Sequence, residues 1–333
     1  MVKNITIQDV AKKCGVSVAT VSRVLNENEN VKSETRDKIL KIVKELDYQP
    51  NYIGRNLRAQ NTKLILVLLP TIVNPFFAKL VKGMEDASRD NGYNIVMCTT
   101  YEDKRVELSH LNMLRSKLFD GVIFIKSALS PNELKEFAKH HHVVQCSEYY
   151  ENIGIPYVSI DNEQAGYDAT KHLIECGCKN ILEMSVNNKA ISTKKRHTGY
   201  MRALDEASLP YDEKNIIFGN YGYRSAVELL NRKIADGTKF DGIFAISDRM
   251  AAGCIRSLHE NNIKVPFDVK VVGFDNIDIA RMINPEITTI SQSQYEMGYS
   301  SVDILIKKIK GEPFSEDKKI IKYNLIKRKS SEV

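Results

Sequence analysis

The chain has 333 residues, of which 43% are hydrophobic and 27% charged, a balance typical of a globular protein with two or three hydrophobic cores. Its six cysteines are scattered, and neither the amino terminus nor any later stretch approaches the roughly 18 apolar residues of a membrane span. We therefore expect a cytoplasmic protein with reduced thiols and no membrane contact. The net charge is +6, and residues 1–60 hold eleven Lys/Arg against seven Asp/Glu, a basic excess that alone barely favours nucleic acid.

The first sixty residues predict three short helices, because they contain no strand-like run and their apolar residues recur at helical spacing. The segment ITIQDVAKKCGVSVATVSRVLN (5–26) has the pattern of a helix-turn-helix. Ala11 lets the second helix approach closely, Gly15 permits the left-handed backbone of a tight turn, and Val21 anchors the second helix in the core. Ser17 is placed to cap that helix.

The start of the second helix is the candidate surface for reading DNA. Arg23 is suited to a bidentate pair with guanine, the small apolar side chains to thymine methyl groups, and the polar ones to phosphates or base edges. The candidates are Ser17, Val18, Ala19, Thr20, Ser22, Arg23 and Asn26. The alternative is an ordinary three-helix bundle with a solvated polar face.

The third helix is predicted to follow Lys32, with Ser33 as its N-cap. Its role is mostly to pack against the other two helices. Four apolar side chains at helical spacing should face the core, namely Ile39, Ile42, Val43 and Leu46. Pro50 should end this helix, and residues 51–59 form either a short helix of their own or a plain linker.

Beyond Lys63 short β-branched runs alternate with amphipathic helical stretches, which indicates parallel sheets with crossover helices. Two series of strands suggest two similar doubly wound lobes. The first series covers 64–69, 94–98, 121–125, 143–146 and 157–160, and the second covers 180–184, 215–218, 242–246 and 269–274. Helices are predicted at 77–91, 163–175, 194–207 and 251–260. The segments ITTIS (287–291) and KKIIKYNLI (318–326), with a helix between them, are expected to cross between the lobes.

The whole chain resembles the LacI/GalR family of repressors, from TIQDVAKKCGVSVATVSRVLN (6–26) through VKSETRDKILKIVKELDYQPNYIGRNLRAQNTKLI (31–65) to the carboxyl-terminal lobe. In that family a dimer binds a pseudo-palindromic operator. The resemblance implies that residues 51–59 form a hinge helix on DNA and that Leu57 wedges into the minor groove. Thr6, Asn51 and Arg58 are further DNA-binding candidates, and so is Thr35 of the third helix, which can contact the phosphate backbone.

Pattern and resemblance together divide the chain into domains. Residues 1–48 form the helical DNA-binding domain, and residues 49–62 the hinge and linker. The rest resembles periplasmic sugar-binding proteins, with an α/β fold of two doubly wound lobes. The amino-terminal lobe takes residues 63–162 with 292–323, and the carboxyl-terminal lobe takes residues 163–291 with 324–333.

The resemblance puts an effector between the lobes, at the carboxyl ends of the strands. Arg196 stands where the family carries its effector-binding arginine, and acceptors follow several strands. Phe76 or Phe77 would pack on a ligand ring, or else belong to the core. The predicted effector residues are Phe76, Phe77, Ser127, Asp161, Arg196, Ser247, Asp248 and Asp275. Each acceptor alone is equally well explained as a helix cap.

The ligand and its effect stay open. An arginine with acidic acceptors and an aromatic face favours a sugar or sugar phosphate over a nucleobase. At three positions this chain carries a different residue from those found in members of the family, which puts the identity of the ligand in doubt. These residues are Cys178, Ser247 and Gln294. The alternative is the same fold acting with a corepressor, either a purine-like ligand or a phosphorylated carrier protein.

Other classes of protein fit less well. The motifs GxGxxG, GxxxxGK[ST], HExxH and GxSxG are absent, so no enzyme, no cofactor and no metal site is predicted. The adjacent histidines 140–142 cannot all face one site, and Cys176-Gly-Cys178 lacks the four donors that zinc prefers. The fused helix-turn-helix argues against a periplasmic solute-binding protein. With no leucine heptads after residue 323, we expect a homodimer and not a tetramer.

Overall fold

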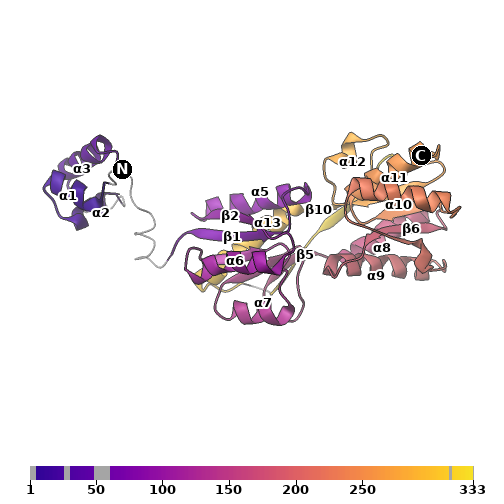
Figure 1. Cartoon of the computed structure of the whole chain (residues 1–333), viewed down its shortest axis with the longest axis horizontal. Coiled ribbons are helices and arrows are strands. Elements are labelled where there is room, and N and C mark those ends of the chain that lie inside the picture. The colour runs from indigo at the N-terminus through magenta and orange to yellow at the C-terminus, as the bar shows by residue number, and fades with distance from the viewer. Residues whose placement is uncertain (1–4, 26–30, 49–60, 315–316, 333) are drawn as a thin grey trace. The chain divides into compact units, whose positions relative to one another are not determined.

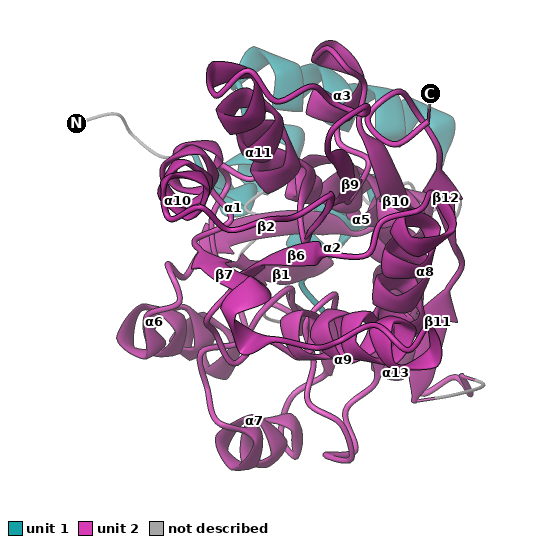
Figure 2. Ribbon diagram, turned by 90° about the vertical axis from the view of Figure 1, so that its right-hand side faces the viewer, with its two compact units in different colours: residues 1–62 teal, residues 63–333 magenta. Residues whose placement is uncertain are grey.

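A computed structural model describes residues 5–25, 31–48, 61–314 and 317–332. The chain divides into two compact units, residues 1–62 and residues 63–333, which Figure 2 colours separately. No helix in the described ranges is long and apolar enough to cross a membrane.

Unit 1 consists of helices α1 (Ile7–Cys14), α2 (Val18–Leu25) and α3 (Ser33–Glu45) (Figure 1). The sequence predicted these three helices. One side chain from each helix is completely buried at their centre, namely Val10, Val21 and Ile39. The other predicted core residues of α3, Ile42, Val43 and Leu46, are half-buried and pack against this cluster.

The turn between α1 and α2 follows the sequence prediction. Gly15 ends α1 with φ 68° and ψ 33°, the left-handed conformation that costs glycine nothing. The Ser17 hydroxyl accepts a hydrogen bond from the Thr20 amide at 3.1 Å and so caps α2. The predicted cap of α3 is wrong. Ser33 is already the first helical residue, so its hydroxyl cannot take the capping position, and Lys32 stands there without a side-chain bond.

Unit 2 contains two six-stranded sheets of matching topology. The first has the order β11-β5-β4-β3-β1-β2, and all its neighbouring strands are parallel. Its strands are β1 (Leu64–Leu69), β2 (Asn94–Thr99), β3 (Gly121–Phe124), β4 (Val143–Cys146), β5 (Tyr157–Ile160) and β11 (Lys318–Ile321).

The second sheet has the order β12-β10-β9-β8-β6-β7 and is parallel except for the β10–β12 pair. Its strands are β6 (Ile181–Val186), β7 (Ile216–Gly219), β8 (Gly242–Ala245), β9 (Lys270–Phe274), β10 (Thr288–Gln292) and β12 (Tyr323–Ile326). The predicted strand at 318–326 is therefore two short strands, β11 and β12, which belong to different lobes.

Helices cover both faces of the first sheet (Figure 1). Alternate residues of β1 point to opposite faces. Ile65 and Val67 share a cluster with Leu80 and Met84 of α5, whereas Leu66 and Leu68 share one with Leu111 of α6 and Leu134 of α7. The helices of this lobe are α5 (Phe76–Asp90), α6 (Lys104–Arg115), α7 (Pro131–Ala138) and α13 (Gln294–Lys310). This double cover explains why β1 reads as an unbroken apolar run.

The second sheet is covered in the same way, with α10 and α11 on one side and α8 and α9 on the other (Figure 1). The helices of this lobe are α8 (Asn162–Glu175), α9 (Ile191–Glu206), α10 (Tyr223–Ala235), α11 (Asp248–Glu260) and the short α12 (Ile279–Met282). A 3-10 turn, η1, covers Glu213–Asn215. The fold class predicted from the sequence is confirmed.

Glycines let α8 and α9 pack backbone to backbone. A Cβ atom at Gly199 would lie 2.0 Å from the backbone oxygen of Glu163, and one at Gly166 would lie 2.3 Å from the backbone oxygen of Arg196. Real Cβ atoms never approach so closely, so only glycine permits this contact. This close packing fixes the position of Arg196 in α9 relative to α8.

Candidate effector cleft and DNA-binding surface

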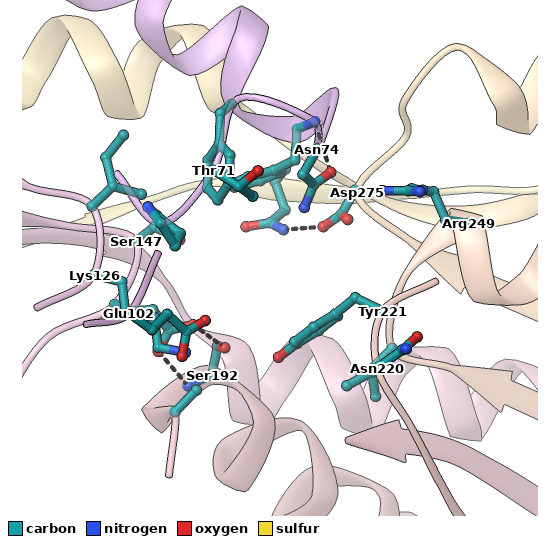
Figure 3. A pocket seen from close by; sticks show the side chains of 18 of the residues that line it. Thr71, Asn74, Glu102, Lys126, Ser147, Ser192, Asn220, Tyr221, Arg249 and Asp275 are labelled. Atoms are coloured by element: carbon teal, nitrogen blue, oxygen red, sulfur yellow. Dashed lines mark hydrogen bonds and ion pairs between the residues drawn. The ribbon is translucent and has the colours of Figure 1, made fainter. Parts of the chain in front are cut away.

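A cavity of about 270 Å³ opens between the two lobes of unit 2. Its lining comes from segments that directly follow strands of both sheets (Figure 3). Thr71 follows β1, Lys126 follows β3 and Glu148 follows β4, whereas Tyr221 follows β7 and Asp275 follows β9. This is the edge at which α/β folds bind ligands.

Arg196 is held rigidly in this cavity by contacts on three sides. Its Nε donates to Asn162 Oδ1 at 2.9 Å, and its Nη1 donates to the backbone oxygen of Ile246 at 2.8 Å. Its guanidinium lies 3.6 Å from the centroid of the Phe274 ring, a cation–π contact. Burial lowers the pKa of Arg196, and the nearby Asp275 carboxyl acts in the opposite direction.

Asp275 lies beside Arg196 at the end of β9 and is only 6% exposed. Gln292 Nε2 donates to its Oδ1 at 2.6 Å, and Gln294 Nε2 donates to its backbone oxygen. Burial raises the pKa of Asp275 to about 7, against the opposing effect of Arg196. Near neutral pH this carboxyl can therefore serve a ligand either as a donor or as an acceptor. Its φ of 110° is strained for a side chain with a Cβ, and such strain collects at functional sites.

Glu148 joins the two lobes. It follows β4 in the first lobe, and its carboxyl accepts hydrogen bonds from the hydroxyl and the amide of Ser192 in the first turn of α9. The residue before this helix is Ala190, so α9 has no side-chain cap of its own, and Glu148 supplies one from the other lobe. Burial raises the pKa of Glu148, and the Ser192 donors oppose that shift. A second bridge, from Lys195 Nζ to Glu151 Oε1 at 2.7 Å, runs parallel to it.

Phe76 and Phe77 supply the aromatic side of the cavity. They begin α5, and their rings meet edge to face at a centroid distance of 5.4 Å. Phe76 is only 6% exposed and also belongs to the hydrophobic cluster of the first lobe. Ligand contact and core packing, which the sequence left as alternatives, are therefore compatible here.

Four other predicted effector residues lie outside this lining. Ser127 donates to Glu107 Oε1 at 2.5 Å, and Asp161 caps α8 through the Gln164 amide at 3.0 Å. Ser247 caps α11, and the completely buried Asp248 accepts a hydrogen bond from the Ile277 amide at 2.8 Å. Each of these four side chains already makes a hydrogen bond that stabilises the fold.

The cavity also has lining residues that the sequence analysis missed, among them Glu148, Ser192, Asn220, Tyr221, Arg249 and Gln292. Most of them follow strands that the sequence did identify. The signal that could have found them was position directly after a parallel strand, applied to every strand of both series.

The candidate DNA-binding residues of unit 1 gather around the start of α2. Val18, Ala19 and Arg23 are exposed, and Thr20 and Ser22 are half-buried. Arg23 makes no hydrogen bond or ion pair with any described residue. The hydroxyls of Ser17 and Thr20 lie 2.9 Å apart and share the capping of α2.

The remaining candidates are spread more widely. Thr6 caps α1 in a reciprocal arrangement with Asp9, and Thr35 is half-buried in α3. Asn26, Asn51, Leu57 and Arg58 lie outside the described residues, as does the predicted hinge at 51–59.

Together these features define a class of protein. Unit 1 is a helix-turn-helix with an exposed arginine on its second helix. Unit 2 is a two-lobed α/β domain with a polar and aromatic cavity at the carboxyl ends of its strands. A chain that combines them is a DNA-binding regulator with a ligand-binding domain.

Comparison with known proteins identifies the family. The profile described as "Bacterial regulatory proteins, lacI family" matches residues 6–51, and "Periplasmic binding proteins and sugar binding domain of LacI family" matches residues 62–329. The regulator RegA of Clostridium saccharobutylicum is 36% identical over 98% of this chain and 99% of its own length. The chain belongs to the LacI family of transcriptional repressors.

Solved structures agree with this assignment. The complex of the transcriptional regulator CelR with cellobiose has a TM-score of 0.73 at 28% identity, covering 98% of this chain and 99% of that one. The lac repressor dimer bound to operator and the anti-inducer ONPF has a TM-score of 0.90 at 22% identity, covering 99% of both chains. The second likeness concerns the fold alone.

Proposed function

We propose that this chain is a homodimeric cytoplasmic repressor of a pseudo-palindromic operator, and that a sugar bound between the lobes of unit 2 controls its affinity for DNA. The observation that carries the proposal is the cavity itself. The cavity combines the fixed guanidinium of Arg196, the Asp275 carboxyl and the aromatic rings of Phe76 and Phe77. A sugar has hydroxyls that can bind the charged groups and an apolar ring face that can pack on the aromatic rings.

On the DNA side, each protomer inserts α2 into the major groove of one half-site. Arg23 binds a guanine edge, and the exposed Val18 and Ala19 contact thymine methyl groups. Arg23→Ala should weaken binding to the cognate operator by about 1–3 kcal/mol and relax specificity at one base pair. Lys44→Ala, which removes an equal charge from the exposed side of α3, is the matched control. Equal loss on random DNA would make Arg23 a phosphate contact.

On the effector side, a sugar changes the contacts between the lobes. In the present arrangement the Glu148–Ser192 and Glu151–Lys195 bridges hold the lobes together beside the cavity. A ligand that replaces or strengthens these contacts shifts the balance between arrangements of the lobes. The coupling between ligand and operator should be about 1–3 kcal/mol, and each must change the affinity for the other by the same factor. In support of a sugar, the CelR relative was solved with cellobiose.

The dimer is supported by exposed apolar side chains along one edge of the first lobe. Met97 of the edge strand β2 is 50% exposed and Val96 is 37% exposed. Ile72 and Val73, which follow the neighbouring strand β1, are more than 70% exposed. Exposed apolar side chains gathered near one edge of a sheet suit an interface with a second copy.

The experiment that tests this function is a selection of bound duplexes from a random pool at near-physiological salt. A pseudo-palindrome enriched by the unliganded protein supports a dimeric repressor, and ligands can then be titrated against that site. Enrichment only with a purine or another ligand present would favour the corepressor alternative. Enrichment of a single half-site, with or without ligands, would contradict the dimer.

A further inference from the structure

Arg249 is a charged residue of the cavity that the proposed function does not use. It is the second residue of α11, it is half-buried, and it lines the cavity. Its guanidinium makes no hydrogen bond or ion pair with any residue in the described ranges. Figure 3 shows it entering from the side opposite Lys126 and Glu102.

Every other charged side chain in the lining has a partner. Lys126 Nζ binds Glu102 Oε2 at 2.6 Å, and the Glu148 carboxyl accepts hydrogen bonds from Ser192. Asp275 is bonded by Gln292 and lies beside Arg196, and the donors of Arg196 are directed to Asn162 and Ile246. The lining holds three acidic and three basic side chains, so its formal charges balance. Among these six, Arg249 is the one that has no hydrogen-bond or ion-pair partner in the described part of the chain.

Two acids of the lining, Asp275 and Glu148, have raised pKa values, which changes this balance. Burial raises the pKa of Asp275 to about 7 and also raises the pKa of Glu148. Near neutral pH the Asp275 carboxyl therefore carries only part of its negative charge. The positive charges of Arg196 and Arg249 are then only partly offset.

The stability of α11 does not explain why an arginine stands at position 249. The amino-terminal end of a helix carries a partial positive charge, so a cation in the first turn is mildly unfavourable. Ser247 already caps this helix by accepting from the Met250 amide at 3.3 Å. The unpaired guanidinium in the cavity instead favours a negatively charged group as its partner.

We propose that the effector carries an anionic group, a phosphate or a carboxylate, which binds Arg249, so that the ligand is an acidic sugar. This inference rests on the proposed function, because it assumes that a sugar occupies the cavity. Thr71, Asn220 and Tyr221 line the same cavity and offer further polar groups to the ligand. A guanidinium binds phosphate or carboxylate oxygens through two parallel N–H donors, whereas a neutral hydroxyl takes only one.

The test is calorimetric titration of the full-length protein with matched sugars. Each set contains a neutral aldose, its terminal phosphate and its aldonate or uronate, and inorganic phosphate is titrated separately. We expect one acidic form to bind about ten- to hundred-fold more tightly than its neutral parent, and added salt to reduce this preference. Whether the phosphate or the carboxylate form is preferred identifies the source of the charge.

Variants connect that preference to Arg249. Arg249→Gln should remove the ten- to hundred-fold preference, because it lowers the affinity for the acidic sugar far more than the affinity for its neutral parent. Arg249→Lys should retain part of it. Arg256→Gln is the matched control, because Arg256 lies on the exposed side of the same helix and pairs with Glu260 at 2.7 Å. Operator binding and melting temperature report whether each variant is folded.

Three further outcomes would overturn the inference in distinguishable ways. Equal binding of neutral and acidic sugars, unchanged in Arg249→Gln, would reject the anionic group and leave the sugar effector intact. Failure of every sugar to bind, with operator binding retained, would reject the sugar effector and the acidic sugar together. Inorganic phosphate binding as tightly as any sugar phosphate would also reject an acidic sugar as the ligand.

Discussion

Asp275 carries an unfavourable conformation and an unfavourable environment at once. It has a φ of 110°, it is 6% exposed, and its pKa is raised from 3.8 to about 7 by burial. Neither feature stabilises the fold. Both are consistent with a side chain whose position is set by the ligand that it meets, because strain and shifted pKa values concentrate at binding sites.

The shifted pKa of Asp275 predicts how stability depends on pH. Because the pKa is higher in the folded state than in the unfolded state, the folded state loses stability as the pH rises from about 4 to about 7, by roughly 4 kcal/mol. Asp275→Asn cannot ionise, so the variant should become progressively more stable relative to the parent over this range. Urea denaturation of both proteins at pH 5 and pH 8 measures the difference. A difference that does not change with pH would contradict the prediction.

The cleft shows what could be predicted residue by residue. Arg196 was predicted from the resemblance to the LacI/GalR family, and Asp275 from its position after a strand, and both line the cavity. Arg249 and Glu148 also follow strands, but nothing in their local sequence separates them from ordinary surface charges. Glu148 is significant because it binds Ser192 of the other lobe, and Arg249 because it lines the cavity without a partner among the described residues. Only the folded structure reveals either.

At the scale of elements, α8 and α9 form the support on which the cleft is built. Asn162 at the start of α8 accepts from Arg196 in α9, and Ser192 in the first turn of α9 binds Glu148 of the other lobe. The close packing at Gly166 and Gly199 fixes these positions relative to each other. A small displacement of α9 would thus move two groups of the cavity together.

Gly199→Ala should therefore disturb both stability and ligand binding. The added Cβ would lie 2.0 Å from the backbone oxygen of Glu163, so α8 and α9 must separate, at a cost of about 1–3 kcal/mol. Ligand affinity should fall because Arg196 moves with α9. Thr198→Ala, on the exposed side of the same helix, is the control. A melting temperature no lower than that of the control would show that the helices accommodate the methyl group.

Elements were predicted to different degrees. The strands of both lobes were recognised because sheets covered on both faces need unbroken apolar runs, and LILVLL of β1 is such a run. Helices α6, α7 and α10 were not singled out in the sequence. The sequence predicted β11 and β12 as one segment because only Lys322 separates them. That the chain changes from one sheet to the other at this residue depends on tertiary structure, which the local sequence does not show. The cap of α3 was misplaced by one residue, at a boundary that propensity alone does not fix.

At the scale of the whole molecule, three passages of the chain connect the lobes of unit 2. They lie between β5 and α8, between β10 and α13, and between β11 and β12. All three connections are short, so a change in the relative orientation of the lobes requires all three connections to bend together. The cavity lies beside these passages and receives lining from both sheets (Figure 3). This arrangement makes a rotation of the lobes the simplest response to a ligand.

Dimer formation decides whether such a rotation reaches the operator, because two half-sites are read together only when two copies are joined. Met97 is 50% exposed on the edge strand β2, and a lysine there would bring an uncompensated charge into an apolar interface. We expect Met97→Lys to sediment as a monomer of 37.8 kDa and to lose about a hundred-fold in operator affinity, while each half-site is still recognised. Leu118→Lys, at a similarly exposed position of the same lobe, should remain dimeric. A Met97→Lys protein that sediments as a dimer would exclude this edge from the interface, and operator affinity would then show whether another face joins the two copies.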